Sequence, residues 1–264
     1  MRLSITHRTQ YKYDAPVDYA LQQVRLTPTS NTQQNVLSWQ VEVDGGHEEL
    51  SFSDQYNNHT LMVSIVPGGD MVTLTASGEI DTLDSSGVLG PVYGYAPLWH
   101  FTLHSELTKP GRGIRKLSRT ITDDDVLTSL HALSAAIGEQ VRYEAGQTYA
   151  ATSAEQALEG GAGVCQDHAQ IFISAARTAG IPARYVSGYL MMNDRVDQDA
   201  SHAWAEAHID GLGWVGFDVS NGISPDERYV RIATGLDYRD ASPVSGMRMG
   251  TANESMIVSV QVQQ

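Results

Sequence analysis

The sequence holds a single cysteine, Cys165, among its 264 residues, so no disulfide can form within the chain. This scarcity agrees with a reducing compartment, and we expect the protein to lie in the cytoplasm. Long apolar runs are missing as well, because no stretch approaches the roughly 20 residues of a membrane helix. The first residues, Met1 to His7, contain no continuous apolar segment and do not predict a secretory signal. We therefore expect a soluble protein without membrane attachment.

Positive charge is in short supply. Lys and Arg together number 17 against 31 Asp and Glu, which gives a formal charge of −14. A field of this sign repels polyanions, so it argues against nucleic acid or an anionic membrane as partner, whereas a cationic amine is tolerated. The same acidity also serves solubility without any partner.

Two stretches of different character follow each other along the chain. The first is rich in β-branched residues that partly alternate with polar ones, separated by glycine-rich turns such as residues 44–46. Strands at this spacing are typical of a β-sandwich. Because the composition shifts around residues 108–113, we predict an antiparallel β-sandwich domain over residues 1–107 and a second domain over residues 114–264. The strands expected in the first domain cover residues 3–6, 36–43, 60–66 and 72–76.

Helical patterns open the second domain. A hydroxyl residue, Thr122, precedes the run Asp123-Asp124-Asp125, and apolar residues at helical spacing follow, so the aspartates are interpreted as a helix cap rather than a metal site. A capping-box pattern begins the next helix, and Gly180 ends the third. The three helices are expected over residues 126–137, 152–160 and 165–179.

Strand patterns return after Pro182. In residues 202–208 large and small side chains alternate, which places His202 and Trp204 on one face and the alanines on the other, against a close neighbour such as the third helix. The expected strands cover residues 183–190, 202–208, 214–219 and 257–262.

Cys165 stands where a glycine-rich loop, residues 160–164, gives way to the third helix. A thiol at a helix start feels the partial positive charge of unpaired backbone N–H groups, which favours the reactive thiolate. A lone cysteine is more often a small buried apolar residue, and that alternative depends on its neighbours. Here His202 and Asp218 follow in the order nucleophile, base and orienting carboxylate, which is the pattern of nucleophilic acyl transfer.

The spacing of these residues poses a geometric problem. A regular hairpin would set Asp218 opposite Ala205, about 10 Å along the strand from His202. We therefore expect a bulge or a leaning side chain to bring the carboxylate to the imidazole.

Several motifs occur in one order along the chain: Gly163-Val164-Cys165-Gln166-Asp167, the run GIPARYVSGY at residues 180–189, His202-Ala203-Trp204-Ala205-Glu206, Gly213-Trp214, and Phe217-Asp218. Together they resemble the core of the transglutaminase-like superfamily. Residues 11–13, 25–28 and 54–58 look like the β-region that precedes this core in bacterial members, and residues 233–246 look like the segment that follows it. The resemblance implies an α+β chain, in which the sandwich is followed by a papain-like core with helices packed on an antiparallel sheet.

The resemblance also implies an activity and its residues. Cys165, His202 and Asp218 match the family's catalytic cysteine, histidine and aspartate. They imply a cysteine peptidase, amidase or acyltransferase that acts on a peptide or protein through a thioester, which water or an amine then resolves. This mechanism requires no metal or organic cofactor. The chain departs from the family pattern at four positions, His168, Val219, Leu236 and Asn57, none of which is a reacting group.

The roles of further residues, and an alternative function, stay open. We assign Trp204, His168 and Tyr149 to substrate binding, and Gln147 or Tyr149 is a candidate second donor to the carbonyl oxygen. His168, one helical turn from Cys165, competes as base, although lining the cleft or packing suits it better. A metal site built from Cys165, His168, His202 and His208 lacks paired ligand spacing. The alternative function is a binding or scaffolding module that kept the fold and lost turnover.

Overall fold

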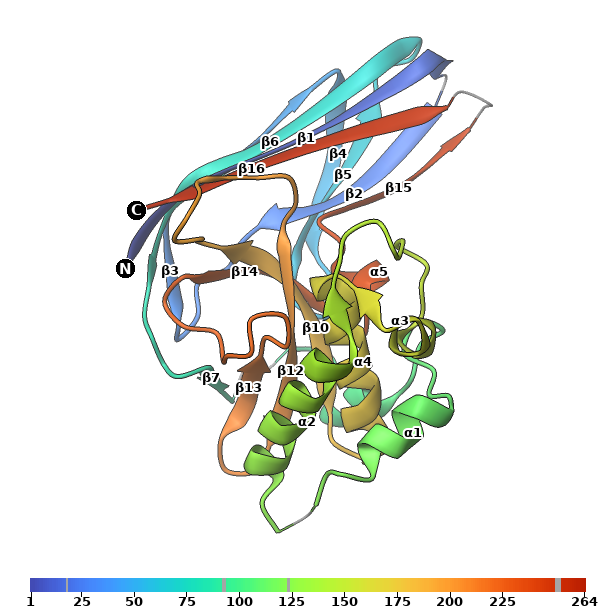
Figure 1. Cartoon of the computed structure of the whole chain (residues 1–264). Helices are drawn as coiled ribbons and strands as arrows, with labels where there is room; N and C mark the ends of the chain where they lie inside the picture. The colour runs from blue at the N-terminus through green and yellow to red at the C-terminus, as the bar shows by residue number, and fades with distance from the viewer. Residues whose placement is uncertain (18, 92–93, 123, 250–252) are drawn as a thin grey trace.

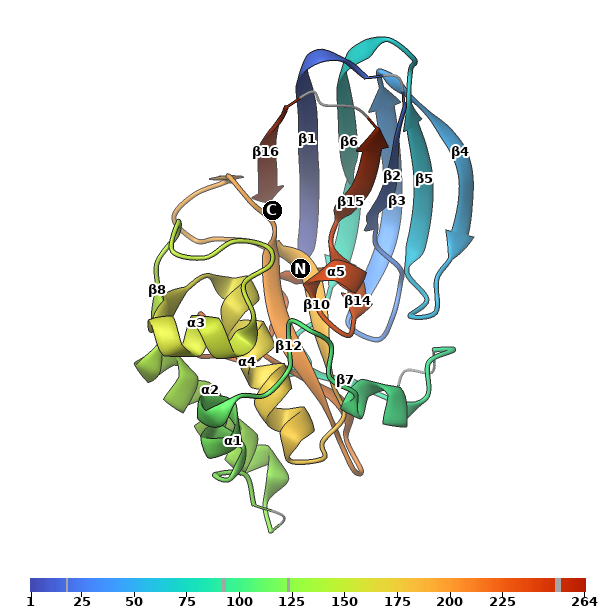
Figure 2. The same ribbon diagram turned by 90° about the vertical axis from the view of Figure 1, so that its right-hand side faces the viewer.

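Two facing sheets form a sandwich at one end of the molecule, and a third sheet with helices on one face lies at the other end (Figures 1 and 2). The computed structural model describes residues 1–17, 19–91, 94–122, 124–249 and 253–264. The first sheet has the order β11 (Asp197–Gln198), β16 (Glu254–Gln263), β1 (Arg2–Val17), β6 (Gly69–Thr82) and β3 (Gln34–Asp44). The second has the order β15 (Val244–Met249), β2 (Tyr19–Thr27), β5 (His59–Ile65) and β4 (Gly46–Ser53).

The third sheet is the antiparallel sheet on which the sequence predicts that helices pack. Its order is β14 (Tyr229–Gly235), β10 (Ala183–Leu190), β12 (His202–Ile209), β13 (Gly213–Phe217) and β7 (Val88–Gly90). A small parallel pair joins β8 (Arg142–Tyr143) to β9 (Ala162–Gly163). The helices are α1 (Arg112–Ser118), α2 (Val126–Gln140), α3 (Ala154–Gly160), α4 (Cys165–Thr178) and α5 (Tyr238–Ala241), with a 3-10 helix at Leu98–Thr102. The predicted fold class is confirmed: antiparallel sandwich sheets, and helices packed on an antiparallel sheet.

Strand β1 shows how the sandwich forms. Its residues alternate between buried and outward positions along most of its length, so Leu3 and Ile5 enter the core between the sheets. The prediction of a strand over residues 3–6 is correct in place but far too short. The buried face continues through His7 and Thr9, which are polar, hydrogen-bonded to each other and buried. Polar residues on the inner face hide the alternation that identifies a strand.

The alanines of β12 let α4 approach the third sheet closely. Ala203, Ala205 and Ala207 lie in one apolar cluster with Ile171 and Phe172 of α4. Every residue of α4 from Asp167 to Arg177 is buried. The predicted division of β12 into an alanine face and a face bearing Trp204 is therefore confirmed. Among the described residues, no helix combines the length and the apolar character that crossing a membrane requires.

Helix α2 begins differently from the sequence expectation. Asp125 is its N-cap, and the Asp125 carboxylate accepts a hydrogen bond from the Thr128 N–H at 3.0 Å. The hydroxyl of Thr122 instead contacts Ser129 at 3.1 Å. The predicted aspartate cap thus rests on the last aspartate of the run, whose first member, Asp123, lies outside the described residues.

The two predicted domains exchange strands. At the C-terminal end, β15 pairs with β2 and β16 pairs with β1, so that Ser4 stands opposite Gln263. In the other direction β7 joins β13 of the third sheet. Strands β15 and β16 thus pair with strands of the sandwich, although they fall within residues 114–264, which the sequence assigns to the second domain. The boundary between residues 107 and 114 stays a prediction.

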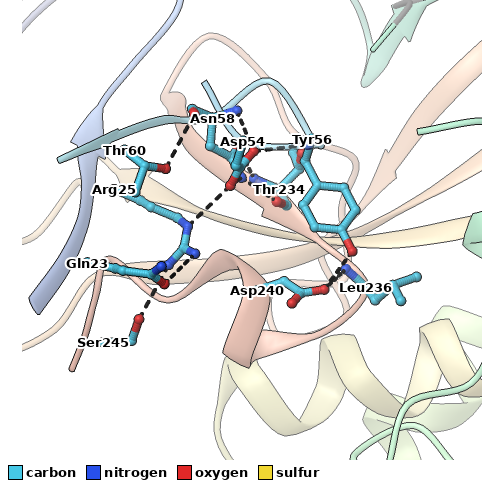
Figure 3. A network of polar contacts seen from close by, with 10 residues as sticks. All are labelled: Gln23, Arg25, Asp54, Tyr56, Asn58, Thr60, Thr234, Leu236, Asp240 and Ser245. Carbon is cyan, nitrogen blue, oxygen red and sulfur yellow. Dashed lines mark hydrogen bonds and ion pairs between the residues drawn. The ribbon is translucent and has the colours of Figure 1, made fainter. Parts of the chain in front are cut away.

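A buried polar network connects the sandwich to the third sheet (Figure 3). Asn58 exchanges two hydrogen bonds of 2.8 Å with the backbone of Thr234 on β14. The Asn58 amide also donates to Asp54 at 2.9 Å, and Asp54 forms an ion pair with Arg25 at 3.3 Å. Nearby, the Tyr56 hydroxyl donates to Asp240 of α5 at 2.7 Å. The loop after β4 therefore holds β14 in place.

Replacing Asn58 by Ala should destabilise the fold. The backbone N–H and C=O of Thr234 would then lose their partner inside the protein, which costs about 1–3 kcal/mol. Urea unfolding would measure the loss, and the exposed Asn35→Ala exchange, expected to change stability by less than about 0.5 kcal/mol, is the matched control. Equal stability of the two variants would contradict this role.

Candidate active site

Cys165 is the first residue of α4, and its side chain is partly exposed. The first backbone donors that find a partner are those of Asp167 and His168, which both donate to the Val164 carbonyl. The N–H of Cys165 belongs to the opening turn, where helix geometry supplies no acceptor. Cys165 therefore combines partial exposure with a backbone donor for which its helix supplies no acceptor.

Asp167 fixes the loop that leads into α4. Its Oδ2 accepts hydrogen bonds from the Val164 N–H at 2.8 Å and from the Thr148 hydroxyl at 2.6 Å. A Cβ at Gly163 would lie 2.6 Å from the same oxygen, so only glycine leaves the carboxylate its place. Asp167 thereby ties the loop before the cysteine and the chain at Thr148 to one buried charge.

His202 is the first residue of β12. Its Nε2 donates to Asp218 Oδ2 at 2.6 Å, and 12% of its side-chain surface remains exposed. The ring stacks at 28° on Trp204 and tilts at 59° against Tyr229. Two aromatic walls and one carboxylate therefore determine the orientation of the imidazole.

Asp218 reaches the imidazole without a bulge. The β12–β13 ladder pairs Ala205 with Phe217, one residue out of the expected register. A shift by one residue moves a side chain to the other face of a sheet, and here it brings Asp218 to the face that carries His202. The chain then leaves β12, and Asp218 exchanges backbone hydrogen bonds of 2.9 and 3.2 Å with Ile223. The predicted register is corrected, and the ladder continues regularly up to that point.

The carboxylate of Asp218 is fully buried and well supplied with donors. Besides His202, the Asn221 side chain and the Tyr229 hydroxyl each donate to Oδ2 at 2.7 Å. Burial favours the neutral acid, but these hydrogen bonds and the charge of His202 hold the pKa of Asp218 below its usual value. Asn221 belongs to the motif that follows the aspartate, whereas the contact of Tyr229 depends on the tertiary fold and had no signal in the sequence.

The imidazole is strongly biased toward its charged form. Burial works against the charge, but the hydrogen bond with Asp218 and the nearness of Cys165 and of the negatively charged Asp218 raise the pKa of His202 to about 10. The structure thus brings Cys165, His202 and Asp218 together from three separate segments. A cysteine beside an oriented, charged imidazole is an arrangement that suits nucleophilic catalysis.

The raised pKa predicts how His202 titrates. NMR of the labelled imidazole should show His202 protonated well above neutral pH, with a lower pKa in the Asp218→Asn and Cys165→Ala variants. Because the folded pKa exceeds the ordinary value of 6.5, the pairing stabilises the fold below that pH and this contribution is lost as the pH rises through about 10. An ordinary titration near 6.5 in the intact protein would contradict this prediction.

Two of the residues assigned to substrate binding are buried. His168 contacts Ser220 Oγ at 2.8 Å through Nδ1 and the Val141 carbonyl at 2.9 Å through Nε2, so neither ring nitrogen is free for a substrate or for the thiol. Trp204 is 3% exposed and packs edge-on against Tyr229. Burial argues against contact of either side chain with a substrate: His168 is held between Ser220 and Val141, and Trp204 stacks on His202.

Tyr149 lies elsewhere and stays available. It is 71% exposed and lines a cavity of about 230 Å³. The other residues around this cavity are uncharged: Gln147, Thr148, Thr152, Gln156, Gly160 and Ala162. A role of Tyr149 in substrate binding remains a prediction.

The four residues considered as a metal site do not converge. His208 packs its ring on Trp214, near the end of β12 opposite to His202, and His168 is held by Ser220. Across the part of the chain that the structure describes, no group of three or more His, Cys, Asp or Glu side chains is placed to hold a metal ion.

Comparisons with known proteins agree with this geometry. The family model of the transglutaminase-like superfamily matches residues 115–219, and that of the bacterial transglutaminase-like N-terminal region matches residues 3–81. Two uncharacterised mycobacterial proteins are similar along the whole chain. The one from Mycobacterium leprae (strain TN) is 26% identical over 281 residues, covering 99% of this chain and 98% of that protein. The one from Mycobacterium tuberculosis (strain ATCC 25618 / H37Rv) is 28% identical over 288 residues, covering 99% and 91%.

One solved structure shares the fold. The crystal structure of a candidate cysteine protease from Cytophaga hutchinsonii superposes with a TM-score of 0.79 at 23% sequence identity, covering 100% of this chain and 91% of that chain. The structural similarity therefore extends over both the sandwich and the helical part. At 23% sequence identity it shows that the two proteins share a fold, and nothing further.

Proposed function

The chain belongs to the transglutaminase-like superfamily, and we propose that it is a cysteine-dependent amidase or peptidase that cleaves amide acyl groups of peptides or proteins through a thioester. The single observation that carries the proposal is the 2.6 Å hydrogen bond between His202 and buried Asp218, beside the partly exposed sulfur of Cys165. A packing role for the cysteine would not require a charged, oriented imidazole next to it.

Each residue has one task in the proposed reaction. The Cys165 thiolate attacks the carbonyl carbon, a C–S bond forms, and the carbonyl π electrons move to oxygen. His202 gives its proton to the leaving amine as the C–N bond breaks, which leaves a thioester. Asp218 keeps the imidazole in the useful tautomer and offsets its charge. His202 then takes a proton from water, which attacks the thioester and releases the acid and the thiol.

Water is the acyl acceptor that the proposal favours. A primary amine could attack the same thioester by the same steps. The net charge of −14 tolerates a cationic amine near the site. Transfer to an amine is therefore the variant of this chemistry that an experiment has to separate from hydrolysis.

Alkylation of Cys165 tests the pairing of sulfur and imidazole. Iodoacetamide at mildly acidic pH should label the intact protein rapidly, and His202→Ala should slow labelling by about 10²-fold, because the thiolate loses its counter-charge. His208→Ala, at the opposite end of the same strand, is the matched control and should leave the rate unchanged. With only one cysteine in the chain, total labelling reports this site alone. Equal rates in all three proteins would favour the scaffolding module.

The reaction products identify the acceptor. Incubating the protein with a peptide library, with and without a primary amine, should give cleaved peptides in both cases, and Cys165→Ala should give none. Amine adducts without cleavage would replace the amidase proposal by an acyltransferase. No product from a protein that labels normally would overturn both.

A further inference from the structure

Positive charge is concentrated around one helix of this acidic protein. Five of the 17 Lys and Arg residues lie within residues 109–119, a segment without Asp or Glu. Because the remaining 12 stand against 31 Asp and Glu, the rest of the chain carries a formal charge of −19. All five side chains are exposed, and all but the first belong to α1 or its C-cap. They are Lys109, Arg112, Arg115, Lys116 and Arg119.

The five cations lack the partners that arginines have elsewhere in the protein. Most other arginines form an ion pair, as Arg2 does with Asp81 and Arg228 with Asp226. No carboxylate of the described residues forms one with any of the five. Their charge is therefore not neutralised by the described part of the chain, although acidic residues are plentiful in it.

Four of the cations line one cavity. It has a volume of about 650 Å³ and lies between α1 and the end of α3. The two helices are in close contact there, because a Cβ at Gly113 would lie 2.9 Å from the side chain of Leu158. We call this cavity the α1 groove. Its described walls hold one acid and no aromatic ring, and they are formed by Arg112, Gly113, Arg115, Lys116, Arg119 and Glu159.

The electrostatics of the helix explain only part of this cluster. Cations near the C-terminal end stabilise a helix, which suits Arg115 and Lys116. Arg112, however, is the first residue of α1, where the helix dipole disfavours a cation. The Glu155 carboxylate accepts hydrogen bonds from three backbone N–H groups of residues 111–114, at 2.6 to 3.0 Å. Side chains, and not the helix terminus, therefore make the groove positive.

The α1 groove lies within reach of the proposed active site. Ser174 and Arg177, in the second half of α4, hold Thr108 just before α1 through hydrogen bonds of 2.6 and 3.2 Å. In Figures 1 and 2, α1 lies at the end of the molecule away from the sandwich. Helix α4 starts at Cys165 and has 14 residues, so it is about 20 Å long. An extended peptide covers this distance with about six residues.

The walls of the groove suit an acidic polypeptide better than a nucleic acid. Carboxylates can pair with the four cations, and Glu159 can accept hydrogen bonds from peptide N–H groups, which a phosphodiester backbone lacks. Without an aromatic ring, the groove offers no surface on which bases stack. The net charge of −14 repels a long polyanion, but salt screens charges beyond about 8 Å, so the local cations dominate at contact.

We propose that the α1 groove is a docking site for an acidic segment of the substrate polypeptide, and that another part of the same polypeptide then reaches Cys165. The inference rests on the proposed function, because it names the class of substrate. Docking forms ion pairs and hydrogen bonds only, and the bond that is cleaved lies elsewhere. Substrates should therefore carry Asp or Glu residues about six or more positions from the cleaved amide.

Binding of a dye-labelled hexaglutamate peptide tests the groove without turnover. Fluorescence anisotropy with the Cys165→Ala protein should show binding that weakens as salt is added, whereas hexaglutamine should not bind. Combining Arg115→Glu with Lys116→Glu should weaken binding about tenfold, because two attractions become repulsions. Arg115→Gln with Lys116→Gln keeps good helix formers and should weaken binding less. It replaces the first pair if that pair lowers the midpoint of thermal unfolding.

A control pair changes the net charge equally at another place. Arg8→Glu with Lys12→Glu reverses two exposed cations of β1 and should leave binding of hexaglutamate unchanged. Equal weakening by both Glu pairs would overturn the docking site, since the net charge alone would then govern binding. Tighter binding of single-stranded DNA than of hexaglutamate would overturn the assignment to an acidic polypeptide.

Cleavage of the peptide library connects the groove to the reaction. The intact protein should cleave peptides with an acidic segment at lower KM than neutral ones. The Arg115→Glu and Lys116→Glu pair should lose this preference and cleave neutral peptides with unchanged kcat/KM. Absence of a preference in the intact protein would overturn the inference and leave the proposed function standing. Absence of all cleavage would overturn the proposed function and the link to substrate, while hexaglutamate binding decides separately whether the groove holds an acidic segment.

Discussion

The hydrogen bond between His202 and Asp218 is the interaction on which the site depends. Because Asp218 is buried, its carboxylate needs hydrogen-bond donors from the protein. A carboxylate without solvent must have its oxygens satisfied inside the protein, or it takes up a proton and loses its charge. Here the imidazole, the Asn221 amide and the Tyr229 hydroxyl all converge on Oδ2. The loop after β13 and the first residue of β14 therefore help to hold the carboxylate of the proposed catalytic site.

A second constraint acts on the sulfur from the opposite side. The small alanine face of β12 allows α4 to lie close to the sheet, which brings the start of the helix to the start of the strand. Asp167 then fixes the backbone just before Cys165 through its bonds to Val164 and Thr148. The proposed nucleophile, Cys165, and the proposed base, His202, thus belong to a packed helix and a packed strand, and little side-chain freedom has to be lost when they meet.

The sequence predicted the fold class because it rests on local patterns, such as alternation in residues 202–208 and helix caps. Motifs in a fixed order selected Cys165, His202 and Asp218, which the fold brings together and whose catalytic role stays a prediction. Prediction from the sequence failed where tertiary context decides. The register of β12 against β13 differs by one residue, which no propensity reveals. The length of β1 was hidden by polar inner residues such as His7. Tyr229 reaches Asp218 because β14 pairs with β10, and this pairing joins distant segments of the chain.

The sandwich contributes to the site through β14, although none of its strands contains a triad residue. Gln34 exchanges two hydrogen bonds of 2.9 Å with the backbone of Arg231, and Asn58 does the same with Thr234 at 2.8 Å. Both amides come from the sandwich region, and both form hydrogen bonds with the backbone of β14. The first residue of this strand, Tyr229, donates to Asp218. In the part of the chain that the structure describes, β14 lies at the edge of its sheet and has only β10 as a neighbouring strand. The two amides hold the free side of β14 instead. A displacement of the sandwich would therefore move β14 and Tyr229, and through Tyr229 it would change the position of Asp218 and the orientation of the His202 imidazole.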